Sequence, residues 1–143
     1  MSLIDDAEYL LRRLAVLREA EELASQAVPH MVPDLRRLYR STLRHLAAIV
    51  ARLLGSKASM GARRPGLPLE TIERLFLGLK VEAEFEKWRA SRLRGKERKE
   101  AEADADELAR MTRQAATAVK LLAEAHDVWS EQYVQDLGLE PWL

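Results

Sequence analysis

Apolar residues recur along this chain at intervals of three and four, the spacing that predicts amphipathic α-helices. Four helical segments are expected, at about residues 3–26, 33–54, 68–93 and 100–137. Proline and glycine separate them, because proline restricts the residue before it and glycine favours helix C-termini. The pattern therefore predicts an all-α protein, an elongated bundle of about four helices with a long C-terminal helix, in a single domain of residues 1–143.

The third of these segments carries two apolar faces. Leu69, Ile72 and Leu75 begin the first face, while Leu77 and Trp88 belong to a second one almost diametrically opposite. A monomeric helical bundle normally needs one apolar stripe per helix. The second face is therefore expected to be covered, either by the first helix or the C-terminal tail of the same chain or by a partner subunit. The candidate subunit-interface residues are Leu77, Val81, Phe85, Trp88, Trp142 and Leu143.

Charge is distributed unevenly along the chain, although the formal net charge is zero. Residues 35 to 99 carry a net charge of +11, and residues 100 to 143 carry −7. No Asp or Glu occurs from Leu35 through Leu69, a stretch that holds eight Lys or Arg residues. Because solvated helix faces usually mix both signs, an acid-free run of this length favours a polyanionic partner.

The first arginines of the second helical segment are expected to point away from its core. Projection at about 100° per residue places the apolar stripe on one side and Arg36, Arg37, Arg40 and Arg44 on the other. Phosphate binding would offset the repulsion among these charges by releasing counterions. A following loop and a second basic cluster near residue 90 extend the cationic surface. The candidate nucleic-acid-binding residues are Arg36, Arg37, Arg40, Arg44, Arg52, Lys57, Arg63, Arg64, Lys87, Arg89, Arg92 and Arg94.

Patterns that carry catalytic or metal chemistry are weak in this chain. It has no cysteine, and its three histidines do not form an i,i+4 pair. Arg40 and His45 match the Arg-x4-His spacing of HEPN-type ribonucleases, but five residues along a helix turn the two side chains about 140° apart. Four acids loosely resemble the carboxylate helices of all-α nucleotide pyrophosphohydrolases, although surface ion pairs explain them as well: Glu82, Glu86, Asp104 and Glu107. We therefore expect no metal, no cofactor and no catalytic role, and a core position for His126.

Targeting signals are also missing from the pattern. The N-terminus lacks the basic and apolar regions of a signal peptide, and the longest apolar run is too short to span a bilayer. An intracellular or virion location without membrane insertion is expected. The chain has no Asn and prefers Arg to Lys by 17 to 6, which fits a thermophile source.

One segment resembles a known family. The residues from Phe76 to Trp88, FLGLKVEAEFEKW, are similar to a segment in the helical coat (nucleocapsid) proteins of rod-shaped and filamentous archaeal DNA viruses. Those proteins wrap duplex DNA between paired subunits. The resemblance implies a virion or nucleoprotein coat protein that packages DNA while it self-assembles, and it assigns no role to individual residues.

Two hypotheses follow from the sequence. In the first, the protein is a non-catalytic, structural nucleic-acid-binding protein that contacts the backbone of duplex DNA and forms homo- or hetero-oligomers. In the second, it is a helical adaptor or self-assembling scaffold without nucleic acid, in which the basic region of one subunit meets the acidic C-terminal region of the next. Both hypotheses use the same arginines.

Overall fold

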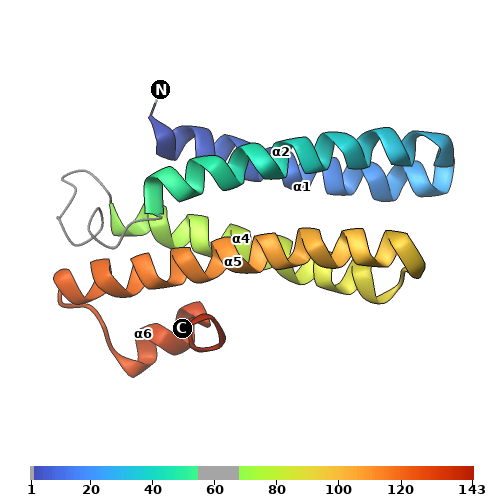
Figure 1. The fold of residues 1–143 in the computed structure, drawn as a ribbon. Helices are drawn as coiled ribbons and strands as arrows, with labels where there is room; N and C mark the ends of the chain where they lie inside the picture. Colours follow the sequence, from blue (N-terminus) through green and yellow to red (C-terminus); the bar gives the residue numbers. More distant parts are fainter. Residues whose placement is uncertain (1, 55–67) are drawn as a thin grey trace. The chain divides into compact units, whose positions relative to one another are not determined.

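The structure of the protein, a computed structural model, describes residues 2–54 and 68–143 (Figure 1). Its helices are α1 (Leu3–Ala27), α2 (Val32–Leu54), α4 (Leu69–Ser91), α5 (Gly95–Ala125) and α6 (Glu131–Leu137), with short 3-10 turns η1 (Pro29–Met31) and η2 (Glu140–Trp142). The described residues contain no strand, so the prediction of an all-α helical fold is confirmed. The chain divides into two compact units, Met1–Ile49 and Val50–Leu143, with the boundary inside α2.

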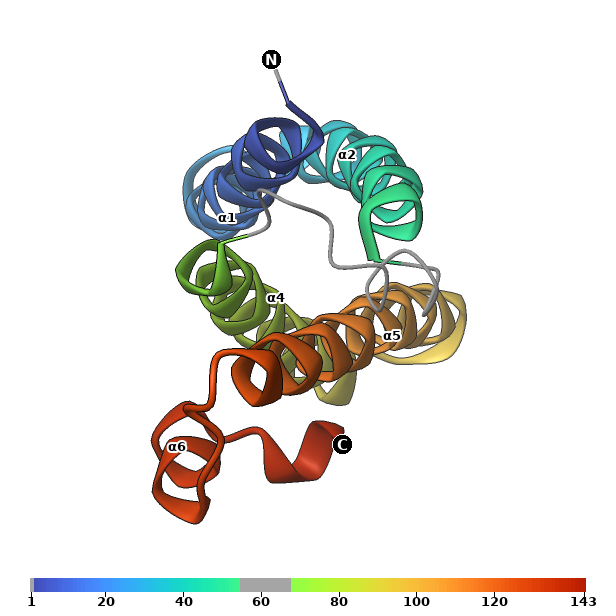
Figure 2. The same cartoon turned by 90° about the vertical axis from the view of Figure 1, so that its left-hand side faces the viewer.

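The first unit is an antiparallel pair formed by α1 and most of α2 (Figures 1 and 2). A capping box starts α1: the Ser2 hydroxyl accepts from the Asp5 backbone N–H at 3.2 Å, and the Asp5 carboxylate accepts from the Ser2 N–H at 3.4 Å. Pro29 opens the turn between the helices. The buried apolar residues of this unit include Leu10, Leu14, Leu17, Tyr39, Leu43, Leu46 and Ile49. They recur at helical spacing, so amphipathicity specifies this hairpin.

In the second unit α4 and α5 form another antiparallel pair (Figures 1 and 2). Gly95 lies at their junction with φ +60°, a conformation that glycine adopts without strain. The buried apolar residues of α4 and α5 include Ile72, Leu75, Phe76, Leu79, Leu108, Met111 and Val119. Buried alanines recur along α5 as well, at 101, 105, 115, 116, 118 and 123. These small side chains let a neighbouring helix approach α5 closely.

The predicted continuous helix over residues 100–137 is wrong. The helix ends at Ala125, Asp127 adopts φ +59°, and α6 begins only at Glu131. Ser130 caps α6 through its hydroxyl, which accepts from the Tyr133 N–H at 3.1 Å. His126, expected in the core, is exposed at the end of α5. Local capping chemistry has therefore interrupted a stripe that apolar spacing alone would continue.

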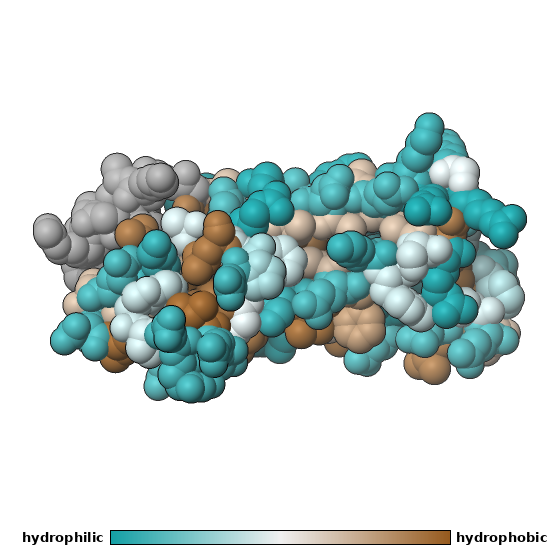
Figure 3. Space-filling model, turned by 90° about the horizontal axis from the view of Figure 1, so that it is seen from below, coloured by the Kyte–Doolittle hydropathy of each residue, from teal (hydrophilic) through white to brown (hydrophobic). Residues whose placement is uncertain are grey.

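The C-terminal segment folds back onto the α4–α5 pair. The Tyr133 hydroxyl donates a hydrogen bond to Glu73 of α4 at 2.5 Å, and Leu139 is fully buried. Gly138 has φ +65°, and a Cβ added there would lie 2.5 Å from the Lys80 amine. Figure 3 shows apolar surface gathered over α6 and the C-terminal turn, at the left of the view. Part of the C-terminal tail therefore packs on its own chain, while the terminal Leu143 stays exposed.

Candidate nucleic-acid interface

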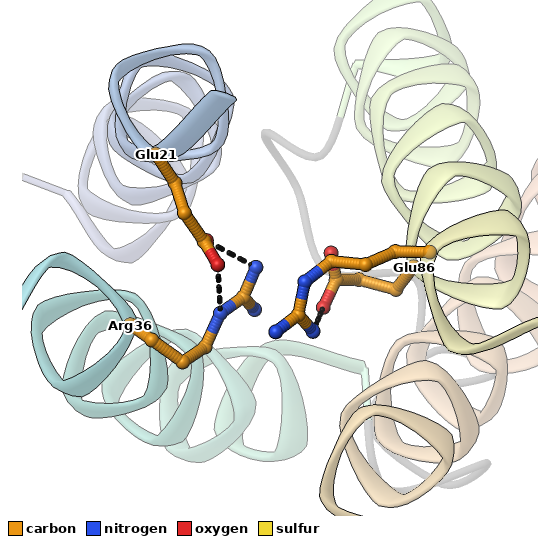
Figure 4. A network of polar contacts seen from close by, with 4 residues as sticks. Glu21, Arg36 and Glu86 are labelled. Atoms are coloured by element: carbon orange, nitrogen blue, oxygen red, sulfur yellow. Dashed lines mark hydrogen bonds and ion pairs between the residues drawn. The ribbon is translucent and has the colours of Figure 1, made fainter. Parts of the chain in front are cut away.

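Arg36 does not belong to the exposed basic surface, so the expectation that its side chain points away from the core is wrong. Its side chain is buried in a two-pronged ion pair with Glu21 of α1, at 2.5 Å from Nη2 and 3.2 Å from Nε (Figure 4). Its guanidinium carbon also lies 4.1 Å from the centre of the Tyr39 ring. Arg36 precedes the buried Leu43 by seven residues, two helical turns, and therefore shares its inner face. A carboxylate on the facing helix makes that inner position tolerable for a cation.

The other arginines of α2 differ in their exposure to solvent and in the groups of the chain that they contact. Arg37 is exposed and forms a surface ion pair with Asp34, the residue directly before the acid-free stretch. Arg40 is half-buried and engages another group of the chain. Arg44 and Arg52 are exposed and form no ion pair within residues 2–54 and 68–143. Lys57, Arg63 and Arg64 lie outside the described residues.

A denser group of exposed cations surrounds the turn between α4 and α5, and we call it the basic turn. Its members are Lys87, Arg92, Arg94, Lys96 and Lys99, all exposed. None of the five forms an ion pair within the described part of the chain. Arg98 also lies here but pairs with Glu102 at 3.1 Å, and Arg89 is half-buried beside Glu86 at 3.4 Å. Of the predicted cations in this cluster, Lys87, Arg92 and Arg94 are therefore solvent-facing, and Arg89 is held by its own helix.

Exposed aromatic rings accompany the basic turn. Trp88 is 55% exposed, and the guanidinium carbon of Arg92 lies 4.8 Å from the centre of its ring. Phe85, one turn earlier on α4, is 42% exposed. Stacking keeps the Arg92 charge at the surface and covers part of the indole, an arrangement worth about 0.5–1 kcal/mol at exposed sites. Cations beside an accessible ring provide groups for both phosphates and bases.

The acids expected at the surface of α4 and α5 are mostly buried instead. Glu82, Glu86 and Asp104 have less than a tenth of their surface exposed, whereas Glu107 forms a half-exposed pair with Arg110 at 2.5 Å. The reading of the first three as surface pairs is therefore wrong. No group of three or more His, Cys, Asp or Glu side chains among residues 2–54 and 68–143 is arranged to hold a metal ion. The spacing of apolar residues does not predict that these acids are buried, because burial depends on the side chains that the facing helix places beside them.

A shallow pocket of about 460 Å³ lies on the α1–α2 pair. Its lining residues are Asp6, Tyr9, Leu10, Arg13, Ser41, Thr42 and His45. Arg13 donates from Nε to the Thr42 hydroxyl at 3.3 Å, and that hydroxyl donates to the Leu38 carbonyl at 2.8 Å. Arg40 does not line the pocket. The arginine that shares a pocket with His45 is therefore Arg13 of the facing helix, and not the one suggested by ribonuclease-like spacing.

Comparison with known proteins supplies no relative: neither a family model, nor a curated protein, nor a solved structure matches this chain. Among the described helices, none is both long and apolar enough to cross a membrane.

Proposed function

We propose that this chain is a non-catalytic, structural nucleic-acid-binding protein that contacts the backbone of duplex DNA through the basic turn and self-assembles while doing so. One observation carries the proposal: five exposed cations within residues 87–99 that form no ion pair among the described residues. The proposal keeps the coat or packaging role that the resemblance of residues 76–88 implies, in the cell or in a virion. It moves the main contact from α2 to the α4–α5 junction.

The possible phosphate contacts can be ranked by the free energy needed to release each cation from its present ion pair. Cations of the basic turn have no carboxylate to give up, so phosphate binding releases counterions without breaking an ion pair. Arg37 pairs with Asp34 at the surface, where such pairs contribute about 0–1 kcal/mol, so a phosphate displaces the carboxylate at small cost. Separating Arg36 from Glu21 would leave a buried carboxylate behind, at about 3–5 kcal/mol. By this criterion the basic turn, Arg44 and Arg52 are the least costly contacts, Arg37 comes next, and Arg36 is the most costly.

Sequence-independent contacts should dominate this interface. Lysine and arginine at a helix junction meet phosphate oxygens, which position the protein on the duplex but carry no base information. Where no second subunit covers it, the exposed ring of Trp88 adds a surface for an unstacked base, a contact worth about 1–3 kcal/mol where single strands are available. We therefore expect weak discrimination among duplex sequences and measurable binding to single strands.

Two variants of equal net charge test the proposal. The first removes Arg94, Lys96 and Lys99 of the basic turn by alanine substitution. The matched control removes three exposed cations from elsewhere, Arg12, Arg113 and Lys120. Binding to a labelled duplex is followed by fluorescence anisotropy at low salt, on protein freed of co-purified nucleic acid.

The turn variant should lose at least about tenfold in affinity in about 50 mM salt, because three phosphate contacts disappear. The control should lose much less, since its cations do not belong to the basic turn. The proposal is wrong if the native protein does not bind duplex DNA in low salt, or if both variants weaken binding equally.

A second candidate is the helical adaptor or self-assembling scaffold, held by basic-to-acidic contacts between subunits without nucleic acid. It is favoured by the exposed acids of the C-terminal region, which carries a net charge of −7 from residue 100 onward, including Asp106, Glu124 and Asp127. The same turn variant separates the two candidates. If its oligomers dissociate in buffer free of nucleic acid while those of the control persist, the scaffold is supported.

A further inference from the structure

The outer face of α4 carries a stripe of large apolar side chains at the surface. The exposed fractions are 39% for Leu77, 45% for Val81, 42% for Phe85 and 55% for Trp88. They recur at intervals of four, four and three residues and so lie on one side of the helix over about three turns. The inner face of α4 is already occupied by the buried Ile72, Leu75 and Leu79. Adjacent exposed apolar side chains of this size mark an interaction surface more often than isolated ones do.

Opposite charges lie at the two ends of this stripe. Glu70 is exposed near the start of α4, and Arg92 is exposed at its end, stacked on Trp88. Neither forms an ion pair among the described residues. A partner helix would complement both ends if it placed a cation opposite Glu70 and an anion opposite Arg92. A second copy of α4 in antiparallel orientation does so.

We propose that a second copy of this chain covers the stripe, with the two α4 helices antiparallel about a twofold axis at Val81. In that register Leu77 lies opposite Phe85 of the other copy, and Glu70 lies opposite Arg92 of the other copy, twice over by symmetry. Gly78 then lies beside the opposing Phe85 and leaves room for its ring. A parallel pairing would instead bring Glu70 against Glu70 and Arg92 against Arg92.

The size of the stripe predicts a weak dimer. A large apolar or aromatic side chain has roughly 150–250 Å² to bury, so the four residues offer about 350 Å² per copy at their observed exposure. A symmetric pair buries about 700 Å² of apolar surface, which reaches the lower end of specific interfaces only with its polar rim included. Dimerisation should therefore depend on concentration and become stronger when both copies share one DNA molecule.

The dimer also gives the basic turns a defined spacing, and this step, like the strengthening by shared DNA, rests on the proposed function. Arg92 lies eleven residues from Val81, about 16 Å along a helix, so the two copies of Arg92 are about 33 Å apart. One turn of B-form DNA measures about 34 Å. Two basic turns so spaced would meet the same side of a duplex at successive turns. The pairs between Arg92 and Glu70 of the other copy lie at the exposed rim of the dimer, so a phosphate displaces the carboxylate there at small cost.

Cysteine cross-linking tests the dimer directly, because the chain contains no native cysteine. Val81→Cys should form a disulfide-linked dimer under mild oxidation, since residues on the axis bring their Cα atoms within the range of about 4.4–6.8 Å that a disulfide needs. A mixture of Leu77→Cys and Phe85→Cys proteins should cross-link to each other in preference to themselves. Val16→Cys, which is also exposed and lies on α1, serves as the control.

Sedimentation equilibrium without nucleic acid gives the second readout. The native protein should show a reversible monomer–dimer equilibrium, and Phe85→Glu should weaken it by at least about tenfold while the helical content is unchanged. A native monomer at every concentration, preferential self-linking of Leu77→Cys, or coverage of the stripe by α1 would each overturn the inference. Coverage by α1 would appear as slow labelling of Val81→Cys by a thiol reagent in protein dilute enough to be monomeric.

These results are separate from those that test the proposed function. A protein that binds duplex DNA but is monomeric in the absence of nucleic acid contradicts the dimer only. A cross-linked dimer without affinity for DNA contradicts the proposed function and leaves the interface in place.

Discussion

Replacing Arg36 by methionine tests whether this residue is a structural ion pair or a nucleic-acid contact. The substitution keeps much of the apolar volume but leaves the Glu21 carboxylate, 7% exposed, without the guanidinium that donates to it at 2.5 and 3.2 Å. Removing one partner of a buried pair costs about 3–5 kcal/mol. We expect a value near 3 kcal/mol, because Glu21 has a further interaction in the chain. Because small proteins are stable by about 5–15 kcal/mol, the variant should still fold.

Urea unfolding followed by circular dichroism measures this loss as a lower midpoint at an unchanged slope. Arg37→Met is the matched control: its ion pair with Asp34 is exposed, so it should cost less than about 1 kcal/mol. Adding Glu21→Leu to Arg36→Met should recover most of the stability, because a buried apolar pair often replaces a buried ion pair without loss. The reasoning fails if Arg36→Met leaves stability unchanged and instead weakens DNA binding about tenfold, a loss of about 1.4 kcal/mol.

The remaining predictions concern the C-terminal segment. Tyr133→Phe removes the hydrogen bond to Glu73 and should lower the free energy of unfolding by about 1–2 kcal/mol in urea titrations, with faster amide exchange in α6. Burial and that hydrogen bond raise the pKa of Tyr133, so its stabilising contribution should be complete below the unfolded-state pKa of about 10 and lost as the pH rises above it. The urea midpoint between pH 8 and 11 should accordingly fall less in Tyr133→Phe than in the native protein. Gly138→Ala should lower thermal stability by about 1 kcal/mol or more, because alanine is strained at φ +65° and its Cβ would meet the Lys80 amine; an unchanged melting temperature would contradict this.

Most of the fold was predictable because apolar spacing determines where helices form. The predicted 3–26 and 33–54 agree within a residue with α1 and α2, and the predicted 68–93 agrees within two residues with α4. The C-terminal helix was predicted too long, since its apolar stripe continues past the break. Ser130 and Asp127 carried the missing signal: serine favours the N-cap, and aspartate is one of the few residues that tolerate a positive φ.

The candidate site was less predictable, because a cation's environment depends on residues distant in sequence. Arg36 lies in a stretch of sequence without acids, yet its charge is neutralised by Glu21, which lies fifteen positions earlier and faces it across the hairpin. Glu86 resembles a surface acid in sequence and is fully buried. By contrast, Lys87 and Arg94 lie at the end of α4 and the start of α5, where a helical hairpin exposes its junction. Residues at the junction of two consecutive helices are exposed whatever the facing helix carries. The exposure of Lys87 and Arg94 could therefore be predicted without knowing how the helices pack.

The salt dependence of duplex binding tests the central claim most directly. If the five cations of the basic turn each neutralise one phosphate, the logarithm of the association constant should fall against the logarithm of salt concentration with a slope of about −4.5. Alanine at Arg94, Lys96 and Lys99 should reduce the slope to about −2, and the control at Arg12, Arg113 and Lys120 should leave it near its native value. A native slope close to zero, or equal slopes for the native protein and the turn variant, would contradict the account.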